Sequence, residues 1–419
     1  MSSVRTATPQ TARAINDRIA LELLTEHGPL TAARLRELTG LSRPSVAELL
    51  GRLGRDGLVD VVGETGAERR GPNARVYGLV ADRAHVAALD VRFDRVELAL
   101  ADLAGATVAT RTLPLVDAAD AADAAGVAGV AGVAGPASGG QHPMVAAVLA
   151  ALDEIGDAAG VVEPHTVALG APGLADPATG ALRFSDALPA WHRELLAALR
   201  ENLDAPVLLE NEVNLAAIAE HRLGAARDRD TFVLLWLGAG VGAAVVLDGA
   251  LRRGASGGAG EVGFLPVPGR AGLPSATDCE AGFHGLVSGA AVRALAVEHG
   301  LEVGELAPGE LAGPDRPVAE AAERGDGPSG AFLDELAGRV ALGAASAVAV
   351  LDPGCVVLGG EVGRAGGAAL AARVAERLSA ISPLDTEVRA ATVTGNPILG
   401  GALVTALAAA RADLFATDR

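Results

Sequence analysis

The alternation of apolar and polar positions predicts three short helices at the start of the chain. In residues 14–27 the apolar side chains recur at helical spacing, at Ile15, Ile19, Leu23 and Leu24. A second helix is expected between a Thr31 cap and Gly40. Ser42 is a candidate cap for a third helix, whose apolar positions are Val46, Leu49, Leu50 and Leu53. This order of helices and glycine turn is typical of a helix-turn-helix.

Two strand-like runs follow the third helix, at residues 57–62 and 75–79, and they flank a polar loop. The loop, residues 63–74, has the position of a wing. We therefore predict a winged helix-turn-helix DNA-binding domain over residues 13–80, preceded by a disordered lead at residues 1–12.

Beyond residue 80 the pattern predicts an α/β body. Three successive strand-like runs, at 86–91, 96–100 and 107–113, predict a β-meander. Residues 117–141 have no packable periodicity and are interpreted as a low-complexity insertion without an assigned function. After the insertion, helices such as 144–156 alternate with strands at 166–170, 207–209, 232–237, 243–247 and 355–358.

Charge separates the two parts. The chain of 419 residues has a net charge of −18. Residues 1–80 hold eleven arginines and nine acidic residues, a charge of +2, so the remainder carries −20. A slightly basic unit on an acidic body favours local DNA contact, although a random fluctuation in surface charge is the alternative. The chain has no lysine, which excludes a P-loop lysine and a Schiff-base lysine.

The cysteine pattern and the hydropathy indicate a reduced, cytoplasmic protein. Cys279 and Cys355 lie far apart without CxxC spacing, and the N-terminus has no signal-peptide pattern. Apolar runs are interrupted by glycine or charge well before the ~20 residues that a membrane span requires, so no membrane partner is expected.

The third helix is expected to enter the major groove of double-stranded DNA. The candidate DNA-binding residues on it are Ser42, Arg43, Ser45, Ala47, Glu48 and Arg52. Arg43 has the geometry to bind guanine through two hydrogen bonds. Arg69 and Arg70 of the wing are expected to contact the DNA backbone or the minor groove. The alternative is a protein-interaction module with solvated arginines.

Glycine-rich segments follow one another in the body in a specific order. They are residues 170–177, 238–242, 254–263, 357–360 and 395–402, with Glu210-Asn211-Glu212-Val213-Asn214 between the first two. This order resembles the ROK family of repressors, open reading frames and kinases. The resemblance implies a two-lobed, actin-like ATPase (sugar-kinase-like) body. The first lobe would be residues 84–205, the second 206–385, and residues 386–419 would pack back on the first lobe.

Where this sequence departs from the family's motifs, the comparison implies that the kinase chemistry is lost. The family's first phosphate loop, Asp-x-Gly-Gly-Thr, is replaced by Asp90-Val91-Arg92-Phe93-Asp94, and Ala239 replaces the threonine of the second loop. Glu212 stands at the position of the catalytic base, as a vestigial group. Phe264 replaces a zinc-binding histidine, and Cys279 alone remains of three cysteines. We expect no ATP site, no zinc site and no enzyme activity.

On the sugar side, the resemblance implies a ligand-binding role for Asn211, Glu212, Glu261 and Glu280. For Glu261 the alternative is a helix-start carboxylate stabilised by the helix dipole.

Three functions are consistent with the sequence. The first is a transcription regulator, expected to be a repressor, which binds a palindromic operator as a homodimer or homotetramer and responds to a sugar-like effector. The second is an ATP-dependent sugar kinase, for which Asn211 and Glu212 are the motive. The third is a ligand-independent DNA-binding protein whose body serves for oligomerisation.

Overall fold

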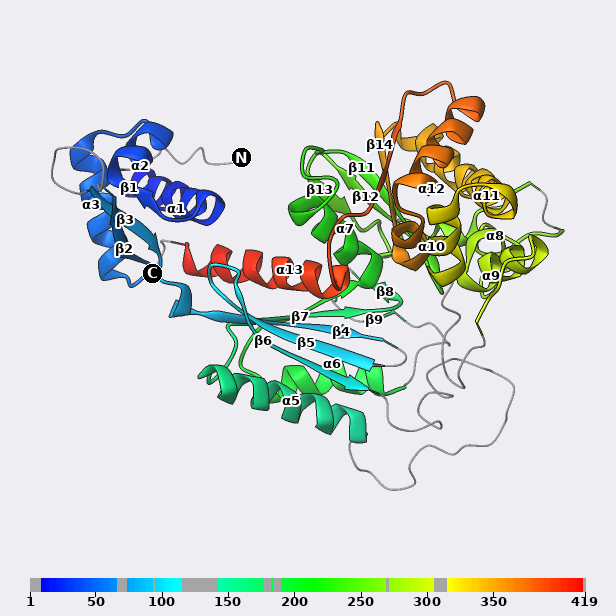
Figure 1. Cartoon of the computed structure of the whole chain (residues 1–419). Coiled ribbons are helices and arrows are strands. Elements are labelled where there is room, and N and C mark those ends of the chain that lie inside the picture. Colours follow the sequence, from blue (N-terminus) through cyan, green and yellow to red (C-terminus); the bar gives the residue numbers. More distant parts are fainter. Residues whose placement is uncertain are drawn as a thin grey trace, which may run out of the picture.

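The computed structural model describes residues 9–65, 74–92, 95–114, 142–176, 179, 182–183, 190–268, 271–304 and 315–416. A small N-terminal domain stands at one end of two larger lobes (Figure 1). Each lobe has its own five-stranded mixed sheet. The predicted insertion at 117–141 lies outside the described residues.

The N-terminal domain is a winged helix-turn-helix. Its elements are α1 (Pro9–His27), β1 (Leu30–Thr31), α2 (Ala32–Thr39), α3 (Arg43–Arg55), β2 (Val59–Thr65) and β3 (Ala74–Leu79). The predicted caps are confirmed. Thr31 accepts a hydrogen bond from the backbone N–H of Arg34, and Gly40 ends α2 with a left-handed φ of 69°. The three strands form a sheet in the order β1-β3-β2.

Helix α1 differs from the prediction at its start and in its buried face. It begins at Pro9, within the segment predicted to be disordered. Its inward side is Asp17, Ala20, Leu21 and Leu24, whereas Ile15 and Ile19 are 52% and 39% exposed. The physical reason is that Asp17 turns inward to pair with Arg52 of α3, which sets the rotation of the helix. Hydrophobicity alone had placed the two isoleucines in the core.

The first lobe contains a sheet with the strand order β10-β7-β4-β5-β6. Its elements are η1 (Ala81–Arg83), β4 (His85–Val91), β5 (Arg95–Asp102), β6 (Thr107–Pro114), α5 (Pro143–Ala159), β7 (Thr166–Ala171), β8 (Leu174–Ala175), β9 (Leu182–Arg183), α6 (Ala190–Asn202) and β10 (Val207–Asn211). The predicted meander is β4 to β6, which pair antiparallel. Helices α5 and α6 cover one face of the sheet (Figure 1).

The second lobe repeats this pattern with the order β13-β12-β11-β14-β15. Its elements are β11 (Phe232–Leu237), β12 (Val241–Leu247), β13 (Ala250–Arg252), η2 (Val262–Phe264), α8 (His284–Val287), α9 (Gly289–Glu298), α10 (Asp315–Arg324), α11 (Gly327–Leu351), β14 (Cys355–Gly359), α12 (Gly360–Ile381) and β15 (Glu387–Ala390). In each lobe an antiparallel meander is extended by two parallel strands. Two such lobes are the architecture of an actin-like ATPase body.

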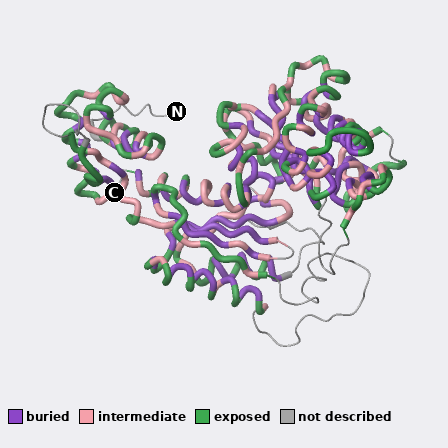
Figure 2. Tube along the Cα trace, viewed as in Figure 1, coloured by how far each residue is buried: buried purple, intermediate pink, exposed green. Residues whose placement is uncertain are grey.

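Helices α7 (Glu212–Leu223) and α13 (Pro397–Leu414) pack between the two sheets. Their apolar side chains, such as Leu215 and Ile398, share one core with Phe232 and Trp236 of the second sheet. Both sheets are buried along most of their length, whereas the surface of the winged helix is largely exposed (Figure 2).

Two predicted boundaries differ from the structure. Strand β10 was assigned to the second lobe but pairs with β7 in the first sheet. Strand β15 was assigned to the C-terminal segment but pairs with β14 in the second sheet. Both are edge strands that join by parallel crossover connections, and a crossover places a strand in a sheet without a local turn to mark it in the sequence.

Among the described residues, α13 is the one helix long and apolar enough to cross a membrane. All of its residues except Ala408, Ala412 and Asp413 are buried or half-buried in the protein. It packs on β4, β5 and β7 and against α7. Its apolar character is therefore explained by the core of the molecule.

Candidate functional site

The N-terminal half of α3 presents a small polar surface. Ser42 caps the helix by accepting the backbone N–H of Ser45, and the two hydroxyl oxygens lie 2.8 Å apart. Arg43, Ala47 and Glu48 are exposed on the same helix. The predicted core positions Val46, Leu49, Leu50 and Leu53 are all buried. The helix therefore has one face for the core and one face open to a partner.

Arg52 does not belong to this open face. Its guanidinium binds the nearly buried Asp17 of α1 through two hydrogen bonds, of 2.6 and 3.1 Å, and lies 3.1 Å from Glu48. The hydrogen bond to Asp17 is the largest cause that raises the pKa of Arg52. An arginine held in this way is a structural tie between two helices, which differs from its predicted contact with DNA. Arg69 and Arg70 lie outside the described residues.

In the body, an arginine is surrounded by carboxylates at the position of the first phosphate loop. We define the Arg92 cluster as Asp90, Arg92, Glu212 and Glu361. Arg92 follows β4, and its side chain is 19% exposed. Its Nε donates to the fully buried Asp90 at 3.1 Å, and its Nη1 lies 3.7 Å from Glu361 at the start of α12. The cluster thereby connects the two lobes.

Neighbouring groups complete the electrostatics of the Arg92 cluster. The Asn396 side chain donates to Asp90 Oδ2 at 2.7 Å, and the Trp236 ring lies 5.9 Å from the Arg92 guanidinium carbon. Burial raises the pKa of Glu212 to about 7; Arg92 opposes this rise, and the charges of Asp90 and Glu361 add to it. The pKa of Arg92 is itself raised by its carboxylate neighbours despite burial.

The Arg92 cluster does not fit the phosphates of a nucleoside triphosphate. Arg92 neutralises only one of three carboxylates, so the cluster is negatively charged even when Glu212 is protonated, and it repels phosphate oxygens. The carboxylate of Glu361 also lies directly over Gly238 of the second loop, where a Cβ would overlap it. Among the four residues of the cluster, the one cation, Arg92, is already paired with carboxylates. Phe93 and Asp94 lie outside the described residues.

Asn211, which was predicted to bind a ligand, has a structural role in the fold. Its Oδ1 accepts the N–H groups of Val213 and Asn214 and so caps α7, and its Nδ2 donates to the carbonyl of Gly173 at 2.8 Å. The preceding Glu210 is buried and accepts a 2.6 Å hydrogen bond from Arg253 of the second lobe. The sequence motif around Asn211 therefore fixes the start of α7 and links the lobes.

Glu261 and Glu280 lie apart from the Arg92 cluster. Glu261 precedes η2 and makes no side-chain capping hydrogen bond; its side chain and that of Leu174 both lie close to Gly258. Glu261 is exposed as a residue, and partial desolvation of its carboxylate raises its pKa. Glu280 is exposed, and its carboxylate lies 3.3 Å from the His284 ring. The structure brings Glu212 together with Asp90 and Arg92, rather than with Glu261 or Glu280.

Several of these residues were not selected from the sequence. Glu361 directly follows the glycine pair at the end of β14, and Asn396 caps α13 within the last glycine-rich segment. Their positions next to or within glycine-rich motifs were the sequence signal that could have indicated a functional role. Glu361 pairs with Arg92, 269 positions earlier, and Asn396 binds Asp90, 306 positions earlier; no sequence pattern predicts these contacts.

Comparison with known proteins decides the family. The model of the ROK family matches residues 118–408, more than half of the chain. This chain belongs to the ROK family. A solved ROK family transcriptional regulator, a homolog of the E. coli MLC protein, shares the fold with a TM-score of 0.71 at 17% identity, over 97% of this chain and 99% of that one.

Transcription regulators and sugar kinases are both similar to this chain. The DNA-binding transcriptional dual regulator NagC of Escherichia coli is 22% identical over 83% of this chain and 80% of its own length. The glucokinase of Thermotoga maritima is 30% identical over 54% of this chain and 72% of its own length. The chain spans only 28% of the length of the bifunctional enzyme NanE/NanK of Brucella melitensis, at 38% identity. The similarity to the regulators thus extends furthest along the chain.

Proposed function

We propose that this ROK family protein is a DNA-binding transcription repressor whose kinase-like body performs no catalysis and responds to a sugar-like effector. The observation that carries the proposal is the Arg92 cluster. An arginine paired with Asp90 and Glu361 stands where a kinase of the family needs glycines for phosphate. A regulator tolerates that change because it needs the two lobes and their motion, and it does not need phosphoryl transfer.

The DNA-binding part of the proposal is supported by the open face of α3. Ser42, Arg43 and Ser45 are exposed at the N-terminal end of the helix, where side chains of a recognition helix face base edges. Among the described residues no ion pair holds the guanidinium of Arg43. It is therefore available to bind guanine or phosphate. Two copies of the chain would read the two halves of a palindromic operator.

The effector part of the proposal is supported by the carboxylate of Glu261 in the second lobe and the side-chain amide of Asn211 at the end of the first sheet. Glu261 and Leu174 both lie close to Gly258, and Asn211 is hydrogen-bonded to the carbonyl of Gly173. Such groups suit paired hydrogen bonds to sugar hydroxyls. Because similar proteins are named as N-acetylglucosamine repressors and as a glucokinase, hexoses and N-acetylated hexoses are the first candidates. A cytoplasmic location accompanies this function.

Footprinting on the DNA upstream of the protein's own gene tests the regulator function. At controlled salt, the chain should protect a palindromic segment, and Arg43→Ala should weaken that protection. Arg324→Ala, which removes an exposed arginine from α10 of the second lobe, is the matched control and should leave protection unchanged. Absence of specific protection by the wild-type chain on any genomic fragment contradicts the proposal.

Sugar kinase activity is the second candidate, and the raised pKa of Glu212 favours it. A carboxylate with a pKa of about 7 has the proton affinity of a general base. A coupled assay of ADP release over hexoses and amino sugars decides between the two functions. Turnover that is abolished in Glu212→Ala establishes the kinase, and no turnover with any sugar eliminates it.

Ligand-independent DNA binding is tested by thermal shift. A sugar that binds the folded chain must raise its melting temperature. A rise with a hexose or N-acetylated hexose supports a sensor, whereas no rise with any metabolite supports a body that serves only for oligomerisation.

A further inference from the structure

Helix α13 begins at the Arg92 cluster. Its N-cap is Asn396, whose Oδ1 accepts the N–H groups of Ile398 and Leu399 while its Nδ2 donates to Asp90. The residue before it is held from the other lobe, because Arg364 of α12 donates to the carbonyl of Gly395 at 2.8 Å. Both lobes therefore contact the start of this helix.

The other end of α13 is part of the core of the DNA-binding domain. Phe415, the residue after the helix, is 4% exposed and lies in the apolar cluster of the winged helix together with Leu103 of the first lobe. The same cluster contains Leu49, Leu50 and Leu53 of α3. Arg411 donates two hydrogen bonds to the carbonyl of Leu103, at 3.1 and 2.7 Å. The winged helix is thus built onto the end of α13, as Figure 1 shows.

Between its two ends α13 has little room to bend. Gly401 approaches α7 so closely that a Cβ there would overlap the Leu215 carbonyl. A straight helix of 18 residues spans about 27 Å, the distance over which any displacement of its start is carried. Packed helices of this kind move as rigid bodies, because a close-packed core does not deform continuously.

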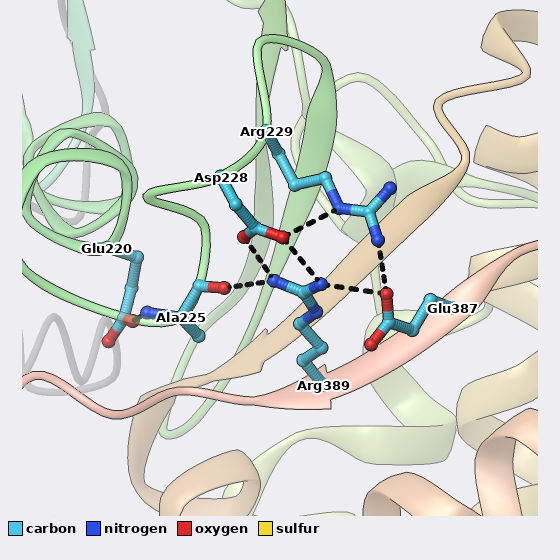
Figure 3. Close-up of polar contacts among 6 residues, drawn as sticks. All are labelled: Glu220, Ala225, Asp228, Arg229, Glu387 and Arg389. Atoms are coloured by element: carbon cyan, nitrogen blue, oxygen red, sulfur yellow. Dashed lines mark hydrogen bonds and ion pairs between the residues drawn. The ribbon is translucent and has the colours of Figure 1, made fainter.

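The chain that leads into α13 is also fixed. The buried Glu220 of α7 accepts hydrogen bonds from the backbone N–H groups of Ala225, Thr392 and Val393. Arg389 in turn binds Asp228 and the carbonyl of Ala225 (Figure 3). The segment that follows α7 and the segment that follows β15 are therefore hydrogen-bonded to each other's neighbours. Because both connections between the lobes are fixed in this way, a rearrangement of the lobes moves α13 with it.

We propose that α13 is a rigid strut that couples the Arg92 cluster to the winged helix. A change in the contacts of Asp90 with Asn396, caused by an effector or by motion of the lobes, displaces α13 and alters the packing of Phe415 in the apolar cluster that it shares with α3. The strut deepens the proposed regulator function and rests on it for its biological use. It assigns the route by which the state of the body reaches the DNA-binding surface.

Hydrogen exchange of the full chain tests the strut without DNA or effector. Asn396→Asp keeps a capping oxygen for α13 but removes the donor and adds a charge beside Asp90. We expect exchange of the backbone amides of Leu49, Leu50 and Leu53 to accelerate about fivefold, as for the loss of one hydrogen bond's worth of protection. Asn202→Ala, which removes one side-chain hydrogen bond at the end of α6, is the matched control and should leave these amides unchanged.

A second variant separates coupling from general destabilisation. In the background of Arg411→Gln, which loosens the attachment to Leu103 without opening the core, the effect of Asn396→Asp on the α3 amides should largely disappear. If Asn396→Asp changes exchange in α13 but leaves α3 at wild-type rates, the strut is refuted. Equal acceleration throughout the first lobe also refutes it, because the effect is then not directed along α13.

Operator binding measured in parallel distinguishes this inference from the proposed function. If the chain protects an operator, Asn396→Asp should change its affinity and Asn202→Ala should not. If no DNA is bound specifically while the exchange result holds, the strut stands and the repressor function fails. If DNA is bound specifically but Asn396→Asp leaves the exchange rates of the α3 amides unchanged, the repressor function stands and the strut fails.

Discussion

The winged helix and the kinase-like body use arginine in opposite ways. Arg43 is exposed at the start of α3, and no described residue forms an ion pair with it. Arg92 is 19% exposed and lies between Asp90 and Glu361. The first arginine is open to an external anion, whereas the second is already neutralised by the protein. An arginine in a sequence therefore indicates a phosphate or DNA contact only where the fold does not pair its guanidinium with a carboxylate.

The largest expected effect follows from removing the buried arginine. Arg92→Ala leaves Asp90, which is fully buried, and Glu361 without their cation. We expect the free energy of unfolding to fall by about 3–5 kcal/mol, measured by denaturant titration. The control is Arg111→Ala, which breaks an exposed pair with Glu154 and should change stability by less than about 1 kcal/mol. Equal effects of the two variants would remove the distinction between the regions.

Arg52 tests the same distinction within α3. Because its guanidinium binds the nearly buried Asp17, Arg52→Ala should lower the free energy of unfolding by about 2 kcal/mol. The neighbouring Arg55 is exposed and contacts only the Gly51 carbonyl among the described residues, so Arg55→Ala should be close to neutral. A stable Arg52→Ala protein with weakened DNA binding would instead place Arg52 at the DNA.

Arg43 should show the reverse behaviour. Arg43→Ala should leave the free energy of unfolding within about 0.5 kcal/mol of wild type, because the side chain is exposed. Its operator affinity should fall about tenfold, as for the loss of a contact to one base pair. Calorimetry and a DNA-binding titration on the same preparation measure both quantities. A destabilised variant would show that Arg43 has a structural partner.

The Arg92 cluster should also give the stability a pH dependence. The folded-state pKa of Glu212 is raised from 4.5 to about 7, so the folded chain holds a proton that the unfolded chain has released. The stability contributed by the neutral form is fully present below pH 4.5 and is lost as the pH rises through about 7. Glu212→Gln should therefore flatten the fall of the melting temperature over this range. Exposed Glu154→Gln is the control, and identical profiles of both variants would contradict the shift.

Local signals in the sequence were sufficient for most of the winged helix. Thr31, Gly40 and Ser42 are caps whose hydrogen bonds reach at most four residues along the chain, and the structure confirms each of them. The rotation of α1 could not be predicted in the same way. It depends on the pair between Asp17 and Arg52, 35 positions apart, which makes a charged residue an inward position and leaves Ile15 and Ile19 outside.

In the body, the order of motifs was enough to predict the fold but did not show what fills the site. The replacement of glycine by Arg92 was visible in the sequence, and its consequence for phosphate was predictable. Its partners were not, because Glu361 and Asn396 reach Asp90 and Arg92 only when the two lobes and α13 are assembled. Likewise, the capping role of Asn211 is a backbone arrangement that a sugar-binding motif does not reveal.

The affinity of the full chain for its operator as a function of salt tests the central claim most directly. Fluorescence anisotropy with a labelled palindromic fragment should give specific binding that weakens as salt rises, because arginines release counterions from phosphates. Arg43→Ala should lower that affinity about tenfold, and Arg324→Ala should not change it. The account would be contradicted if the wild-type chain did not bind the fragment, or if it bound the fragment and random DNA with the same affinity.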